Sequence, residues 1–152
     1  MAVLSAGGAL GVNARYWLGL WMSRWVGPRF PWPTMTINVS GSLAIGFLAT
    51  LLVERFPHPQ FRLFVLVGFL GGYTTFSTYV FEAYTLWERG QSRLALANLV
   101  GSVVAGVLAV ALGVALARAW IGPAGPGPPR FSALDESSEF HTLPEPDAPK
   151  AS

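Results

Sequence analysis

The stretch GFLGGYTTFSTYVFE, residues 68–82, lies in one of the most apolar parts of the chain and still carries a Gly-Gly pair and a cluster of hydroxyl side chains. The hydroxyl residues are Thr74, Thr75, Ser77 and Thr78. Glycine destabilises a helix interior, and Ser and Thr side chains compete with the helix for backbone hydrogen bonds. We therefore predict that the helix formed by this stretch is broken near its centre.

The composition of the whole chain indicates a membrane protein. Of its 152 residues 52% are apolar and 12% are charged, whereas about a quarter are charged in an average soluble domain. The mean hydropathy is +0.45. We predict an all-α membrane protein with spans of about 20 residues. There are four such spans, at about 2–22, 34–53, 61–87 and 94–117, and the third is the broken one.

These spans define a transmembrane domain at 1–121, followed by a tail at 122–152. The tail is rich in proline and acidic residues and has no apolar periodicity, so we predict that it is disordered. The chain has no cysteine, which excludes disulfides and thiolate metal sites. The basic residues lie mostly in the membrane part without a basic helix that carries stacking aromatics, so nucleic acid is not an expected partner.

The arginines near the span ends are balanced between the two sides of the membrane. The side that holds both termini has Arg55, Arg62, Arg118 and Arg130, and the other side has Arg24, Arg29, Arg89 and Arg93. The Lys/Arg bias between loops sets the orientation of a membrane protein. A balanced chain has little bias, so we predict insertion in both orientations and an antiparallel homodimer.

Strongly polar residues inside the spans are expected to face a protein interior or a water-filled path. They are Asn13, Arg15, Asn38, the hydroxyl cluster at 74–78, Glu82 and Asn98. Asn38 lies on one helix face with Thr34 and Ser42, and we predict close helix contacts at Gly41 and Gly46. Asn98 lies on one face with Ser102 and Gly106, and that face serves either a polar path or helix packing alone.

The predicted break has two interpretations. Backbone that leaves the helix inside a bilayer must be buried in protein or line a cavity, and its exposed carbonyls are then potential cation ligands. The alternative is a kink that neighbouring helices cover.

Together, GGALGVNARY in the first span, TMTINVSGSL in the second and GFLGGYTTFSTYVFE in the third resemble the Fluc (CrcB) fluoride channel family. The resemblance covers about residues 5–118, and the third stretch is similar to the family pattern GGxTTFSTF. It implies small four-span proteins that form antiparallel dual-topology dimers. It also implies a fluoride-selective channel that passively exports fluoride across the cytoplasmic membrane and lowers its toxicity inside the cell.

The resemblance further implies roles for individual residues. The backbone carbonyls of Gly71 and Thr74 would hold a structural Na⁺ that is not transported. The implied ion pathway consists of Asn38, Phe76, Ser77, Thr78, Tyr79, Asn98 and Ser102, with Arg15 at a vestibule end and Glu82 at the far end of the third span. Two positions depart from the family pattern, because Tyr79 stands where a Phe is usual and Gly106 lacks the usual hydroxyl.

Two other classes of membrane protein compete with the channel interpretation. A small multidrug exporter is also a four-span dual-topology dimer, but it needs a carboxylate in the first span, where this chain has Arg15. A structural membrane subunit would use the polar stripes for packing only. An enzyme is disfavoured, because His58 and His141 lie in a loop and in the tail and no catalytic arrangement is evident.

Overall fold

The computed structural model describes residues 1–55 and 58–122. Apart from connecting segments, these residues are helical throughout. The helices are α1 (Ala2–Ser23), α2 (Trp32–Arg55), α3 (Pro59–Arg62), η1 (Leu63–Leu70), α4 (Gly71–Tyr73), α5 (Phe76–Glu88) and α6 (Ser92–Ile121). The predicted disordered tail falls almost entirely on residues 123–152, which lie outside the described residues.

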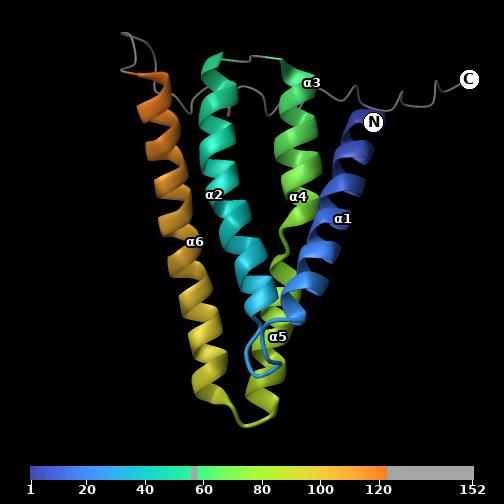
Figure 1. The fold of residues 1–152 in the computed structure, drawn as a ribbon, viewed down its shortest axis with the longest axis vertical. Coiled ribbons are helices and arrows are strands. Elements are labelled where there is room, and N and C mark those ends of the chain that lie inside the picture. The colour runs from blue at the N-terminus through green and yellow to red at the C-terminus, as the bar shows by residue number, and fades with distance from the viewer. Residues whose placement is uncertain (56–57, 123–152) are drawn as a thin grey trace, which may run out of the picture.

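The helices form a bundle in which long segments run side by side (Figure 1). The N-terminus, the end of α2 and the end of α6 lie at one end of the bundle, and the loop before α2 and the turn before α6 lie at the other. Helix α6 packs along α2, and α1 packs along η1 and α4. The loops therefore lie at the two ends to which we assigned them when we compared the arginines on the two sides of the membrane.

Within the described residues, three helical segments are long and apolar enough to cross a membrane. They are Trp32–Val53, Pro59–Glu88 and Ser92–Ile121. Helix α1 has 22 residues but does not reach the same hydropathy, since it contains Asn13, Arg15 and several glycines. Three of the predicted spans are thus confirmed by length and composition, and the first stays a prediction.

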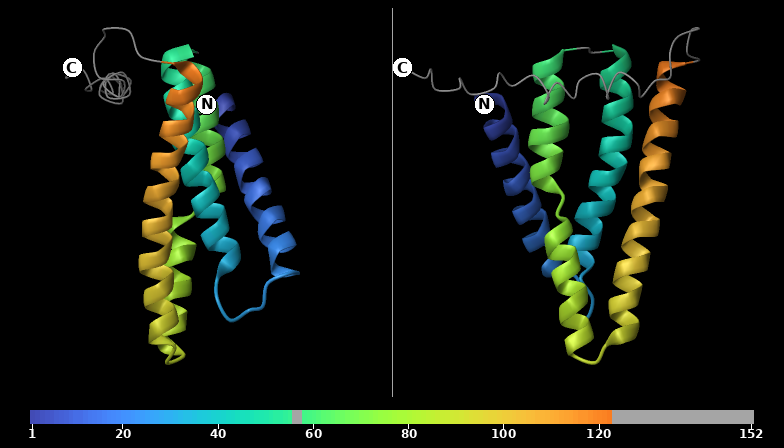
Figure 2. Two further views of the ribbon diagram at one scale, coloured as in Figure 1. Left: turned by 60° about the vertical axis from the view of Figure 1, so that its left-hand side comes forward. Right: turned by 180° about the vertical axis from the view of Figure 1, so that it is seen from behind.

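The third span is broken, as the Gly-Gly pair and the hydroxyl cluster predicted. Helices α3, η1 and α4 continue one another up to Tyr73, after which Thr74 and Thr75 are extended, with ψ angles of 158° and 115°. Helix α5 then begins at Phe76. The extended connection is visible between the two halves of the segment in the right-hand view of Figure 2.

The first half of the third span also contains a feature that the sequence did not predict. Residues Leu63–Leu70 form a π-helix. Such segments are rare, occur mostly as single-turn bulges inside α-helices and are frequent at functional sites. A run of apolar residues has the same pattern in an α-helix and in a π-helix, so hydrophobic periodicity does not distinguish them.

Glycines allow the helix backbones to approach closely. A Cβ atom on Gly11 of α1 would collide with the backbone of Phe69 and Tyr73, and one on Gly113 of α6 would collide with the backbone of Leu43 and Phe47. Small residues at such positions are typical of packed membrane helices. The glycines therefore fix the distance of α1 and α6 from their neighbours.

The two close contacts predicted in the second span are confirmed. A Cβ atom on Gly46 would collide with the backbone of Val110, which places α2 directly against α6. A Cβ atom on Gly41 would collide with the side chain of Thr74, at the helix break. Gly41 thus lets α2 contact the helix break directly.

We predict that Gly113→Ala lowers the free energy of unfolding of the protein in detergent by about 1–3 kcal/mol, because the new methyl group overpacks the contact between α2 and α6. Gly101→Ala, on the same helix, is the matched control. Its Cβ would come no closer than 4.0 Å to Met35 Cε, and alanine favours the helix. Circular dichroism against temperature measures both variants, and equal unfolding midpoints would contradict the prediction.

Candidate functional site

The helix break is held by the side chain of Asn38 on α2. Its Nδ2 donates to the Thr75 carbonyl oxygen at 2.9 Å, and the Thr75 N–H donates to Asn38 Oδ1 at 2.8 Å. The amide side chain thereby pairs with both backbone groups of Thr75, as a neighbouring strand would. Buried backbone groups must be paired, so Asn38 makes the extended conformation of Thr75 tenable within an apolar span.

Further hydrogen bonds fix both sides of the break. Before it, the Tyr73 and Ser40 hydroxyls are 2.8 Å apart, and Thr74 Oγ1 donates to the Leu70 carbonyl at 2.9 Å. After it, Thr75 Oγ1 accepts from the Thr78 N–H at 3.3 Å and so caps α5. Thr75 Oγ1 also donates to Thr78 Oγ1 at 2.9 Å. Most of the hydroxyl cluster therefore takes part in terminating or starting a helix.

These bonds take away the helical donors of the Gly71 and Thr74 carbonyl groups in particular. In an unbroken α-helix the Gly71 carbonyl would accept from the Thr75 N–H, and the Thr74 carbonyl from the Thr78 N–H. Here the first donor is bound to Asn38 and the second to Thr75 Oγ1. A Cβ atom built on Gly71 would also meet open space. Accessible carbonyl oxygens of this kind are ligands for hard cations.

Arg15 of α1 reaches the same break. Its Nη1 lies 3.4 Å from the Thr74 carbonyl oxygen. The close approach of Gly11 to Tyr73, one helical turn earlier, brings α1 near enough for this contact. The resemblance implied a position for Arg15 at a vestibule end, and the structure places its guanidinium beside the break.

A groove of about 490 Å³ opens beside the break and is lined by α2, η1, α5 and α6. It brings together several of the predicted pathway and cation-site residues, namely Asn38, Gly71, Thr74, Phe76, Tyr79 and Ser102. The Phe76 side chain is 76% exposed, and its ring centroid lies 5.7 Å from that of Tyr79. The groove therefore presents an aromatic ring close to Gly71 and Thr74, whose carbonyls have lost their helical donors.

Tyr79 connects α5 to α6 at two points. Its hydroxyl donates to the Leu99 carbonyl at 2.7 Å, and its own carbonyl accepts from Asn98 Nδ2 at 3.4 Å. Ser102 Oγ donates to Asn98 Oδ1 at 3.2 Å, and Asn98 is 1% exposed. The amide of Asn98 is thus used for packing α5 against α6, while Ser102 also lines the groove.

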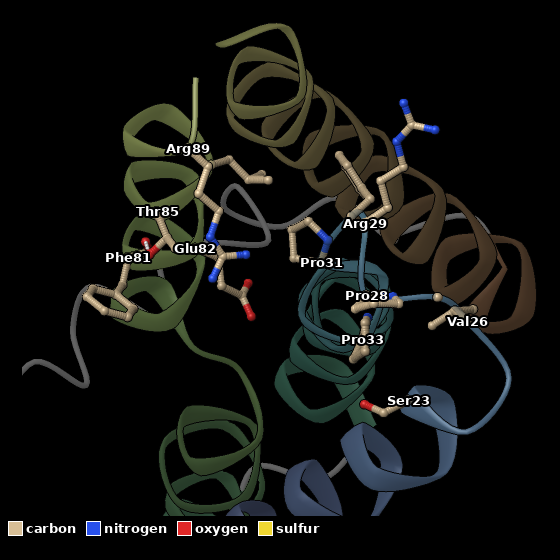
Figure 3. Close-up of a pocket in the computed structure, with 13 residues that line it drawn as sticks. Ser23, Val26, Pro28, Arg29, Pro31, Pro33, Phe81, Glu82, Thr85 and Arg89 are labelled. Carbon is tan, nitrogen blue, oxygen red and sulfur yellow. Dashed lines mark hydrogen bonds between the residues drawn. The ribbon is translucent and has the colours of Figure 1, made fainter. Parts of the chain in front are cut away.

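A second cavity, of about 380 Å³, lies at the end of the bundle that holds the loop before α2 (Figure 3). Glu82 lines it together with Arg29 and Arg89. Glu82 Oε1 accepts from Thr34 Oγ1 at 2.8 Å, and Oε2 is buried without a hydrogen-bond partner among the described residues. The predicted far end of the third span is thus a cavity with charges of both signs.

The sequence placed Thr34 on the same helix face as Asn38 but did not connect it to Glu82. The two residues belong to different helices, and local spacing does not report a contact between helices. The same is true of the Leu99 carbonyl that binds Tyr79, since a backbone acceptor leaves no trace in the sequence. The one available signal was the hydroxyl of Tyr79, which needs a partner when it is buried.

Of the remaining predicted residues, Ser77 and Thr78 lie in the first turn of α5 and are exposed.

The model of the family described as CrcB-like protein, Camphor Resistance (CrcB), matches residues 2–114. That match runs from the start of α1 into the last part of α6. The chain belongs to the CrcB family. The resemblance seen in three sequence stretches is thereby confirmed over most of the helical domain.

Close relatives of the CrcB chain carry the name fluoride-specific ion channel FluC. The protein of Rhizobium meliloti is 48% identical over 120 residues, which cover 78% of this chain and 96% of the relative. That of Solibacter usitatus is 50% identical over 117 residues, covering 76% and 96%. That of Nitrobacter winogradskyi is 48% identical over 116 residues, covering 76% and 92%. The similarity thus extends over nearly the whole length of each relative.

We predict that Asn38→Ala destabilises the protein by about 2–4 kcal/mol, because it leaves the N–H and C=O of Thr75 unpaired. Ser40→Ala, which removes the hydrogen bonds of Ser40 Oγ to the Tyr73 hydroxyl and to the Ile37 carbonyl but none to the backbone of Thr75, is the matched control and should have a smaller effect. Thermal unfolding measures the stability, and hydrogen exchange at the Thr75 amide reports the break directly. An unchanged exchange rate in Asn38→Ala would show that the side chain does not hold the break.

Proposed function

We propose that this protein is a fluoride-specific ion channel that passively exports fluoride across the cytoplasmic membrane and so lowers its toxicity inside the cell. The observation that carries the proposal is membership of the CrcB family together with 48–50% identity to channels named for fluoride. The helical segments long enough to span a bilayer agree with it. A channel of this kind is a multi-pass membrane protein and not an enzyme. In addition to the three segments named above, α1, the first span along the chain, crosses the membrane beside η1 and α4.

The functional unit is an antiparallel homodimer of two subunits inserted in opposite orientations. Supporting this, the groove beside the break is open in the single subunit, and the large Phe76 side chain is exposed at its edge. A second copy of the chain would cover both the groove and the Phe76 side chain. The end arginines of the described residues are also nearly balanced, with Arg55, Arg62 and Arg118 at one end and Arg24, Arg29, Arg89 and Arg93 at the other.

Na⁺ is the cation that we assign to the helix break. The Gly71 and Thr74 carbonyls have lost their helical donors, and the space beside Gly71 is open. Two oxygens from each subunit would give a site of hard ligands, which suits an alkali cation. When bound, Na⁺ would neutralise the carbonyl dipoles and tie the two subunits together without being transported.

The proposed ion pathway follows the groove and uses neutral groups. Asn38, Phe76, Tyr79 and Ser102 line the groove, and Ser77, Thr78 and Asn98 complete the proposed set, with Arg15 beside the break and Glu82 at the second cavity. An aromatic ring has a positive edge, so Phe76 can contact a small anion without holding it as a fixed charge would. Conduction needs binding that is favourable enough for entry and weak enough for exit. Arg29 and Arg89 of the second cavity would concentrate anions near one mouth.

We predict that liposomes containing the protein lose a fluoride gradient and that Phe76→Ile slows this efflux about tenfold, because it keeps apolar bulk but removes the ring quadrupole. A fluoride-selective electrode follows the efflux. Phe61→Ile is the control, since Phe61 is also an exposed aromatic of the third span but lies outside the groove. Absence of efflux with the native protein would refute the channel, and rapid efflux with Phe76→Ile would refute only the aromatic mechanism.

Dual topology is tested by a single cysteine appended to the C-terminus, which is feasible because the chain has none of its own. In intact cells a membrane-impermeant maleimide should label about half of the molecules, since the balanced arginines give no preferred orientation. Three lysines inserted next to Arg118 should shift labelling to one side and reduce fluoride efflux. Native protein labelled entirely, or not at all, would rule out insertion in both orientations.

A further inference from the structure

A positive side chain lies at one of the two carbonyls that we assign to Na⁺. Arg15 Nη1 approaches the Thr74 carbonyl oxygen to 3.4 Å. The Thr78 N–H that would serve this carbonyl in a continuous helix is bound to Thr75 Oγ1 instead. The guanidinium is therefore the hydrogen-bond donor that the Thr74 carbonyl has within the described part of the subunit.

The position of Arg15 is set by the packing of α1. Gly7 and Gly11 allow α1 to lie against the backbone of η1 and α4, and Arg15 follows one turn later at the level of the break. Arg15 is half-buried. Among the described residues, its guanidinium has no carboxylate within ion-pair distance and contacts the Thr74 carbonyl as its polar partner. The charge of Arg15 is thus directed at the break, and no acid of the part of the chain that the structure describes pairs with it.

We propose that Arg15 is an internal cation that competes with Na⁺ for the Thr74 carbonyl. The inference rests on the proposed Na⁺ site. A guanidinium stays charged under all ordinary conditions. Two cations at one carbonyl oxygen repel each other strongly where water is scarce. Na⁺ binding therefore weakens the contact with Arg15, and the affinity of the site for Na⁺ is lower than the carbonyls alone would give.

This competition has a consequence for a subunit without Na⁺. The Thr74 carbonyl would otherwise be left unpaired inside an apolar span, which is unfavourable. Arg15 satisfies it until Na⁺ and the second subunit arrive. The same residue thus stabilises the break before assembly and sets the Na⁺ concentration at which the assembled site fills.

The test measures the unfolding midpoint of the full-length protein in detergent as Na⁺ replaces N-methylglucamine at constant ionic strength. A ligand that binds only the folded protein raises the midpoint with its concentration. We expect Arg15→Met to reach its half-maximal rise at about tenfold lower Na⁺ than the native protein, because the repulsion is gone. Arg15→Gln, which keeps a neutral donor, should shift in the same direction and carries the test if the Met variant does not fold.

The control is the double variant Arg24→Met with Arg118→Met, which removes one exposed arginine from each end of the bundle and preserves the charge balance. It should respond to Na⁺ as the native protein does. If native protein responds but the Arg15 variants need the same Na⁺ or more, the competition is refuted while the Na⁺ site stands. If Na⁺ does not raise the unfolding midpoint even of the native protein, the proposed Na⁺ site is wrong, and the proposed competition is then refuted as well.

Discussion

The pairing of the Asn38 amide with the backbone of Thr75 is the interaction on which the rest of the site depends. An apolar span tolerates extended backbone only where its polar groups are paired, and one side chain pairs both groups of Thr75. Because the Thr75 N–H is taken, the Gly71 carbonyl is released, and α5 restarts at Phe76 with a new direction. The loss of the helical donor of Gly71 therefore depends on one residue of α2.

Glycines make this arrangement possible from both sides of the third span. Gly41 brings α2 against Thr74, and Gly11 brings α1 against Tyr73. Without these contacts Asn38 and Arg15 would be too far from the break to reach it. The membrane supplies no hydrophobic attraction between helices, so close packing and the polar contacts at the break have to hold the subunit together.

The sequence predicted the features that depend on residues close together along the chain. The Gly-Gly pair with its hydroxyls located the break, and an amide in an apolar span marked Asn38 as informative. The π-helix of Leu63–Leu70 escaped prediction because a uniformly apolar run does not encode its hydrogen-bond spacing. The bonds of Tyr79 to α6 and of Thr34 to Glu82 escaped it because they depend on how two helices are placed beside each other.

The hydrogen bonds that build the break also determine which donors are left for an anion on the proposed route. Asn38 Nδ2 carries two hydrogens and uses one for the Thr75 carbonyl. The Thr78 hydroxyl accepts from Thr75, so its own hydrogen is free to donate, and the Ser77 side chain is exposed. The neutral donors near the break therefore include the second amide hydrogen of Asn38 and the single hydroxyl hydrogen of Thr78, and both groups already take part in hydrogen bonds of the break. On the proposed route, Asn38 would thus serve both the break and the anion, whereas the exposed Ser77 side chain has no hydrogen bond among the described residues that the break requires.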